Sequence, residues 1–191
     1  MKRTEELALY LIHHKVVDIE QKEVYQFGLQ QTASMIFDLL IAVTIALIMN
    51  MFVDMIIFMI AFITIRQYAG GYHADKRHLC VFFSIIMEIL SLLAISNYTD
   101  QLFPLTILSV VGICVLSPID TLNNPLDGLE KKHYRKKTII STLFWTFAIF
   151  AAKYTNLVDL YRPVCVAMIF AFLLVLIGWI KAYNLQVGRC L

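Results

Sequence analysis

The sequence predicts an all-α polytopic membrane protein with about six transmembrane helices and an N-terminal amphipathic helical segment. Hydrophobic residues make up 60% of the 191 residues and the mean hydropathy is +0.73, which is above the range typical of a soluble domain. Charged residues make up only 16% and gather in a few short stretches. Between these stretches lie apolar runs of a length near the ~20 residues that a helix needs to cross a bilayer.

Six apolar runs account for the predicted spans. They lie at roughly 34–49, 52–65, 79–96, 102–118, 138–152 and 157–180. The first two form one block that Asn50 and Asp54 interrupt, so we expect two short helices joined by a turn near Asn50. The last run is long enough for one tilted helix, and no internal repeat is visible.

The N-terminal region is too polar to be a span. Residues 1–33 carry many charged side chains, and their apolar positions recur at helical spacing, which is typical of helices lying on a membrane surface. A second helix is expected to start at Asp18, with Gln21 in the capping-box position. We therefore predict two domains, 1–33 and 34–191, and no cleavable signal peptide, since the first residues lack an apolar core.

The basic residues predict the orientation. With six spans and both termini in the cytoplasm, the inner segments are the N-terminal region, 66–78, 119–137 and the C-terminal tail. All of the 16 Lys and Arg then lie inside except Lys153 and Arg162. The predicted location is therefore the cell membrane, with the 66–78 segment on its cytoplasmic side.

One polar segment between two apolar runs holds the candidate chemistry. It extends from Arg66 to Cys80 and reads R-Q-Y-A-G-G-Y-H-A-D-K-R-H-L-C. A cysteine and a histidine at a membrane surface are the minimum set for thiol catalysis. Cys80 is therefore the candidate nucleophile, and His73 is its candidate base or imidazolium partner.

Three features are expected to lower the pKa of the Cys80 thiol. We expect Cys80 in the first turn or two of a helix that begins near Asp75, where the helix dipole favours an anion. Lys76 and Arg77 are close in sequence. His73 would stabilise a thiolate as an ion pair.

Helix geometry limits how Cys80 and His73 can meet. Seven helical residues rise ~10 Å, too far for a hydrogen bond. The chain at His73 must therefore leave the helix and fold back, and Gly70-Gly71 allow that turn and offer amides for an oxyanion. His78 is the poorer partner, because it points to another helix face than Cys80.

Other interpretations of these residues stay open. A metal site from His73, His78 and Cys80 has no CxxC or HExxH spacing to support it, so we expect neither a metal nor another cofactor. Cys114 and Cys165 lie inside apolar runs and are expected to be packing residues.

The polar segment resembles the signature of the accessory gene regulator protein B (AgrB) family, R-x-x-A-x-G-x-H-A-x-x-x-x-x-C. The matching residues are Arg66, Ala69, Gly71, His73, Ala74 and Cys80. Weaker similarities flank it at Gly28-Leu29-Gln30, Pro118, Asn124-Pro125-Leu126 and Lys131–Lys137. The resemblance extends over essentially the whole chain.

The resemblance implies a bacterial membrane cysteine endopeptidase of peptide quorum sensing. Such an enzyme removes the C-terminal tail of an AgrD-like precursor peptide and helps to form a cyclic thiolactone or lactone. It implies Cys80 as nucleophile, His73 as base, and loop or oxyanion support from Arg66, Gly70 and Gly71. The implied substrate-binding residues are Gln30, Lys76, Glu130, Lys131 and Lys132. The implied partners are the precursor peptide, the lipid bilayer and a second copy of the chain, with no nucleic acid.

Two other classes of protein remain as alternatives. A transporter or channel would use the intramembrane carboxylates Asp38, Asp54 and Glu88. The spans lack the repeats or broken helix pairs typical of transporters. A membrane scaffold without chemistry is the other alternative.

Overall fold

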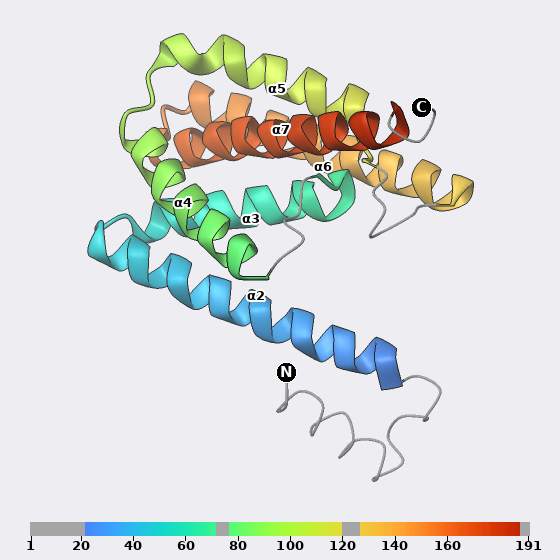
Figure 1. Ribbon diagram of the computed structural model, residues 1–191. Coiled ribbons are helices and arrows are strands. Elements are labelled where there is room, and N and C mark those ends of the chain that lie inside the picture. The colour runs from blue at the N-terminus through green and yellow to red at the C-terminus, as the bar shows by residue number, and fades with distance from the viewer. Residues whose placement is uncertain (1–21, 72–76, 120–126, 188–191) are drawn as a thin grey trace. The chain divides into compact units, whose positions relative to one another are not determined.

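The computed structural model describes residues 22–71, 77–119 and 127–187, and these residues form helices and no strand (Figure 1). The predicted all-α class is confirmed for this part of the chain. The chain forms two compact units, residues 1–44 and 45–191, and each is described by itself.

The helices follow the predicted apolar runs. They are α2 (Lys22–Ile48), α3 (Phe52–Ala69), α4 (Arg77–Ser96), α5 (Phe103–Leu116), α6 (Gly128–Tyr154) and α7 (Val158–Val187), with a short 3-10 turn, η2 (Asp100–Leu102), before α5. The predicted turn near Asn50 is confirmed, because α2 ends at Ile48, α3 begins at Phe52, and Asn50 has a positive φ of 56°.

Helix α2 continues across the predicted domain boundary at 33/34. No glycine or proline occurs between Leu29 and Ile48, so nothing in the sequence interrupts the backbone hydrogen bonds there. The predicted helix start at Asp18 lies outside the described residues. The division into domains 1–33 and 34–191 stays a prediction.

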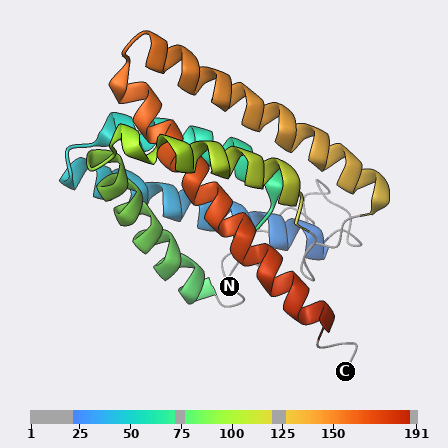
Figure 2. The same ribbon diagram turned by 90° about the horizontal axis from the view of Figure 1, so that it is seen from above.

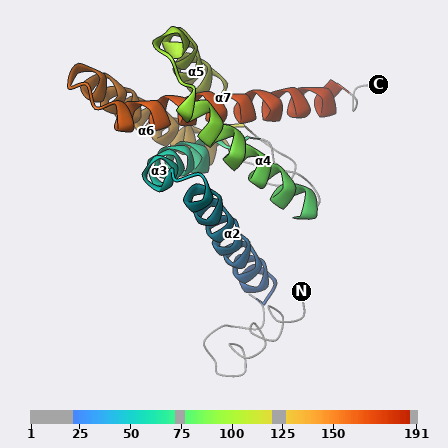
Figure 3. The same cartoon turned by 90° about the vertical axis from the view of Figure 1, so that its left-hand side faces the viewer.

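Within the unit 45–191, α7 is the central helix. It contacts α3, α4, α5 and α6 (Figure 3). Its residues Val164–Met168 are all buried, so this part of α7 is enclosed on every side. The surrounding helices bury one stripe each, as α3 does with Met55, Phe58, Ala61, Ile65 and Ala69.

Two contacts hold helices of this unit close together. Gly112 of α5 packs directly against the ring of Phe172 of α7, where a Cβ atom would overlap the ring. The indole Nε1 of Trp145 in α6 donates a hydrogen bond to Thr64 Oγ1 of α3 at 2.7 Å. Small residues and polar side chains of this kind join helices whose surroundings are apolar.

One end of this unit collects most of its basic residues, and we call it the basic end. The Ile119 amide donates to the Ala69 carbonyl oxygen at 3.0 Å, so α3 and α5 finish side by side. The start of α6 and the end of α7 line one cavity with the end of α5. The cations of this end are Arg66, Lys131, Lys132, Arg135, Lys136, Lys137 and Lys181.

At the opposite end, Lys153 is paired with a carboxylate. A short turn there joins α6 to α7 (Figure 2). Lys153 Nζ lies 3.4 Å from Asp100 Oδ1, and Tyr161 donates to the same oxygen at 3.0 Å. Hydrogen bonds from Tyr161 and Lys153 hold the pKa of Asp100 below its usual value. Tyr98, just after α4, stacks edge-on against Tyr161, so α4 also ends here.

Within the part of the chain that the structure describes, fewer helices than the six predicted spans are by themselves long and apolar enough to cross a membrane. Two helical segments within the described ranges are long and apolar enough to cross a bilayer, Phe52–Ala69 and Val158–Asn184. A third span is added if one bent pair of helices, Val81–Ser96 and Asp100–Leu116, counts as a single span; the two helices of this pair are bent by 118°. Helix α5 has 14 residues, a rise of ~21 Å, which is less than the ~30 Å of a hydrocarbon core. The six-span count therefore stays a prediction.

Large apolar side chains cover much of the outer surface. Phe144 and Phe147 of α6 are 61% and 74% exposed, and Leu108 of α5 is 57% exposed. Exposed apolar surface on this scale is unfavourable in water and suits contact with lipid tails. The apolar helices therefore indicate a membrane protein.

The charge difference between the two ends predicts which one faces the cytoplasm. A cysteine at Leu129, at the basic end, should resist a membrane-impermeant maleimide on intact cells, because basic loops stay inside. A cysteine at Thr99, at the opposite end, should react. Both side chains are exposed, and both sites should react after permeabilisation. Labelling of the Leu129→Cys variant on intact cells would place the basic end outside.

Candidate functional site

The Gly70-Gly71 turn ends α3 in a conformation that only glycine adopts readily. Gly70 has φ 71° and ψ −152°, and Gly71 has φ 130°. A Cβ atom on Gly71 would lie 2.6 Å from Arg66 Nη1 and 3.0 Å from the Leu174 carbonyl oxygen. The turn is therefore closely packed as well as tightly bent, and the sequence signal for it was the glycine pair itself.

Arg66 packs onto this turn from the last turn of α3. The Gly70 amide donates to the Arg66 carbonyl oxygen at 3.0 Å, and Arg66 Nη1 lies 3.4 Å from the Gly70 carbonyl oxygen. Ile119 covers the other side, since its carbonyl oxygen would lie 3.1 Å from a Cβ on Gly70. The structure thus brings Arg66, Gly70 and Gly71 together, as a loop-supporting role requires, and that role stays a prediction.

Cys80 is the fourth residue of α4, so it lies in the first helical turn, where the helix dipole favours a thiolate. Because α4 ends at the opposite end, its first turn points toward the basic end. The Cys80 side chain, His73 and Lys76 lie outside the described part of the structure, so the pairing of Cys80 with His73 stays a prediction. His78 and Cys80 both belong to α4 and are ~200° apart around its axis.

Glu130 has a structural partner at the start of α6. Asp127 is the N-cap of this helix, and its amide donates to Glu130 Oε2 at 3.1 Å, which completes a capping box. The sequence signal was the D-G-L-E pattern, which our site assignment did not use. Glu130 stays a predicted substrate-binding residue, but one whose carboxylate already accepts a hydrogen bond.

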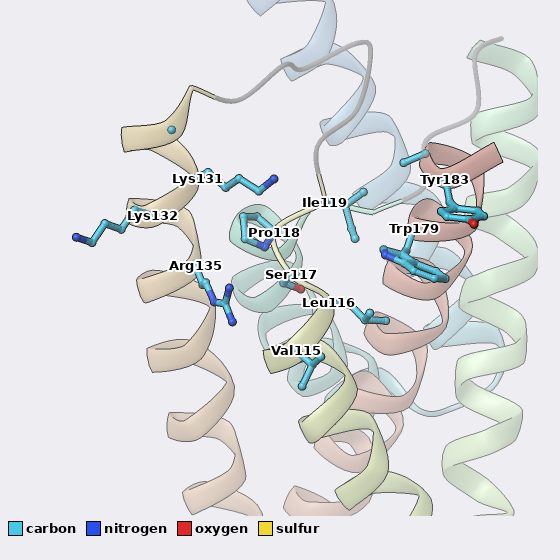
Figure 4. Close-up of a pocket in the computed structure, with 12 residues that line it drawn as sticks. Val115, Leu116, Ser117, Pro118, Ile119, Lys131, Lys132, Arg135, Trp179 and Tyr183 are labelled. Atoms are coloured by element: carbon cyan, nitrogen blue, oxygen red, sulfur yellow. The ribbon is translucent and has the colours of Figure 1, made fainter. Parts of the chain in front are cut away.

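A cavity of about 510 Å³ lies at the basic end, between α5, α6 and α7 (Figure 4). Lys131 points from α6 toward Pro118, and Arg135 points toward the end of α5, whereas Lys132 points away. Trp179 and Tyr183 form the side contributed by α7. The full lining is Val115–Ile119, then Gly128, Lys131, Lys132 and Arg135, then Trp179, Ala182 and Tyr183.

Sequence reasoning did not assign Arg135, Trp179 and Tyr183 to a site. Arg135 follows Lys131 by four residues, which places both on one helix face. Tryptophan and tyrosine near the end of an apolar run are typical of the membrane interface. These signals were present, but only the fold shows that the three residues meet.

Two further predictions have no test in the described residues. Gln30 belongs to α2, in the unit 1–44, and its side chain is not described. The metal site would need His73, which is outside the described ranges. Among the residues that are described, no group of three His, Cys, Asp or Glu side chains could hold a metal ion.

The described residues define an all-helical membrane protein that has a glycine turn and a basic cavity at one end, and its candidate cysteine lies in the first turn of a helix. The family model described as Accessory gene regulator B matches residues 4–184. The chain therefore belongs to the AgrB family, which is involved in accessory gene regulation and is linked to processing in agr quorum sensing.

Individual relatives agree with this assignment. The chain is 32% identical over 164 residues to the accessory gene regulator protein B of Staphylococcus aureus strain MRSA252, with 83% of this chain and 87% of the relative covered. It is 25% identical over 167 residues to AgrB-like protein 2 of Clostridium perfringens strain 13, with 80% and 78% covered. No solved structure matches the chain.

The glycine turn predicts a loss of stability on adding side chains. Gly70→Ala and Gly71→Ala should each lower the free energy of unfolding by about 1–3 kcal/mol, because alanine is strained at these backbone angles. Thermal unfolding in detergent measures the effect. Gly128→Ala is the control, since its Cβ meets nothing within 4 Å and its φ is not positive. An unchanged midpoint for Gly71→Ala would contradict the geometry.

Proposed function

We propose that this protein is a membrane-embedded cysteine endopeptidase that removes the C-terminal tail of an AgrD-like precursor peptide. The observation that carries the proposal is the family match over residues 4–184, which includes the Arg66–Cys80 motif. The position of Cys80 in the first turn of α4 supports it, because a nucleophilic cysteine needs surroundings that favour its thiolate.

The first step transfers the peptide to the enzyme. Cys80 Sγ attacks the carbonyl carbon of the scissile bond, and a carbon–sulfur bond forms. The carbon–nitrogen bond then breaks, and the proton of the thiol passes through His73 to the leaving amine. The tail departs, and a thioester joins the rest of the peptide to Cys80. The Gly70-Gly71 turn, held by Arg66, is the proposed support for this site.

The second step closes a ring without an external energy source. A cysteine or serine side chain of the bound peptide attacks the thioester and gives its proton to the departing Cys80 sulfur. Exchanging one thioester for a thiolactone is nearly balanced in free energy, so the step needs a positioned nucleophile and the exclusion of water. The product is a cyclic thiolactone or lactone for quorum sensing.

The basic end suits the substrate. The precursor is expected to lie on the cytoplasmic surface through an amphipathic leader, and an acidic tail would be attracted to Lys131 and Lys132, which are exposed. Contacts from Gln30, Lys76 and Glu130, and a second copy of the chain as partner, belong to the same proposal. The family assignment supports an endopeptidase over a transporter or scaffold, because this family is linked to processing.

Mass spectrometry of the reconstituted protein tests the proposal. The purified protein in liposomes is mixed with the precursor peptide encoded beside its gene, quenched in acid and digested. An acyl adduct on Cys80, with release of a peptide tail of matching mass, is the expected result. The Cys114→Ala variant should show the same adduct, since Cys114 lies near the end of α5. Tail release with an adduct on another cysteine would overturn the assignment of Cys80.

A further inference from the structure

The cavity at the basic end has two chemically different sides. Lys131 and Arg135 form one side, and Trp179 and Tyr183, whose rings stack at a centroid distance of 5.7 Å, belong to the other (Figure 4). Its volume of about 510 Å³ is within the range of small-molecule sites. A ligand that fits both sides has an anionic group and an apolar body.

The two cations are available for an external anion. Among the described residues, no carboxylate lies within ion-pair distance of Lys131 or Arg135, whereas Lys153 at the opposite end is paired with Asp100. The nearest acidic residues in sequence are Asp127 and Glu130, which are joined in the capping box. The positive charge of the cavity is therefore not neutralised from within this part of the chain.

The cavity also opens onto the apolar surface of the helices. Val115 and Trp179 line it and are 65% and 44% exposed. Tryptophan and tyrosine lie preferentially at the level of lipid headgroups. A ligand seated here would place its charged group at the headgroup level and its apolar part along α5 and α7.

We propose that this cavity binds the phosphate headgroup of an anionic phospholipid, with Lys131 and Arg135 contacting the phosphate. Basic pockets between membrane helices are known to select such headgroups. The exposed apolar side chain of Val115 favours a lipid over the acidic tail of a peptide, because a peptide tail rich in carboxylates gains nothing from apolar contact. This inference does not rest on Cys80 or His73, but it assigns Lys131 to a lipid headgroup, where the proposed function assigns it to the peptide tail.

Native mass spectrometry of the detergent-solubilised protein measures lipid retention. Dioleoylphosphatidylglycerol should be retained in preference to dioleoylphosphatidylcholine. Arg135→Gln should reduce this retention roughly fivefold, and Lys131→Gln with Arg135→Gln about thirtyfold, from the attraction typical of one cation at a charged membrane. Lys136→Gln is the matched control, because it removes the same charge from an exposed side chain of α6 that does not line the cavity.

Several results would overturn the lipid assignment. Equal retention of both lipids, or an equal loss in Lys136→Gln, would show that the cavity does not select a headgroup. If inorganic phosphate protects the protein from thermal unfolding as well as phosphatidylglycerol does, the apolar body of the lipid is not recognised. A synthetic acidic peptide is tested as a competitor. If it displaces phosphatidylglycerol, and if the substitutions weaken binding of the peptide more than they weaken binding of the lipid, the cavity is a peptide site. Thermal unfolding without lipid confirms that each variant is folded.

Discussion

Cys80→Ala is expected to reduce the rate at which the precursor peptide is cleaved by a factor of 10³ or more. Without the thiolate no acyl-enzyme forms, and no other described cysteine begins a helix at the basic end. Cys114 lies near the end of α5, and Cys165 is buried in α7. The measurement is release of the C-terminal tail from the precursor in proteoliposomes, followed by mass spectrometry.

The other cysteines supply matched controls for this loss. Cys114→Ala should keep most of the activity, and so should Cys190→Ala, which changes a cysteine in the C-terminal tail of the sequence. Cys165→Ala removes a buried sulfur beside α5, so it should reduce stability more than turnover. If Cys80→Ala protein still releases the tail at a comparable rate, the nucleophile has been misassigned and the proposed function fails with it.

The helices of this protein were predictable because lipid and core both select apolar residues. Each described helix from α3 to α7 covers one apolar run, and the turn at Asn50 follows from polar residues inside an apolar block. The continuity of α2 was not predictable from polarity, because polarity reports the surroundings of a helix, whereas the backbone continues wherever no glycine or proline stops it.

The candidate site was predictable only where its residues are neighbours in sequence. The glycine turn with Arg66 lies within one segment, and its motif predicted it. The basic cavity joins the ends of three helices, at Val115–Ile119, Gly128–Arg135 and Trp179–Tyr183. Such a meeting depends on how α5, α6 and α7 pack, and periodicity alone contains no information about it. Glu130 is the opposite case, because the neighbouring residues in sequence predict its role in the capping box, and yet it was assigned to substrate binding alone.

The histidine that assists Cys80 is the subject of the second large effect. His78 and Cys80 are both in α4, two residues apart, so their positions are ~200° apart around the helix axis. His73 precedes the helix, and the positive φ angles of Gly70 and Gly71 show that the chain bends sharply just before it. We therefore expect His73→Ala nearly to stop cleavage and His78→Ala to change it only modestly.

The rate at which iodoacetamide alkylates Cys80, measured against pH, separates a catalytic partner from a residue that only supports the fold. An imidazolium beside the sulfur stabilises the thiolate, so losing it should shift the alkylation profile to higher pH. His73→Ala should show this shift, and His78→Ala should keep the wild-type profile. Removing a merely structural histidine would reduce cleavage without moving the profile. If His78→Ala moves it and His73→Ala does not, the chain does not fold back at the glycine turn, and His78 is the base.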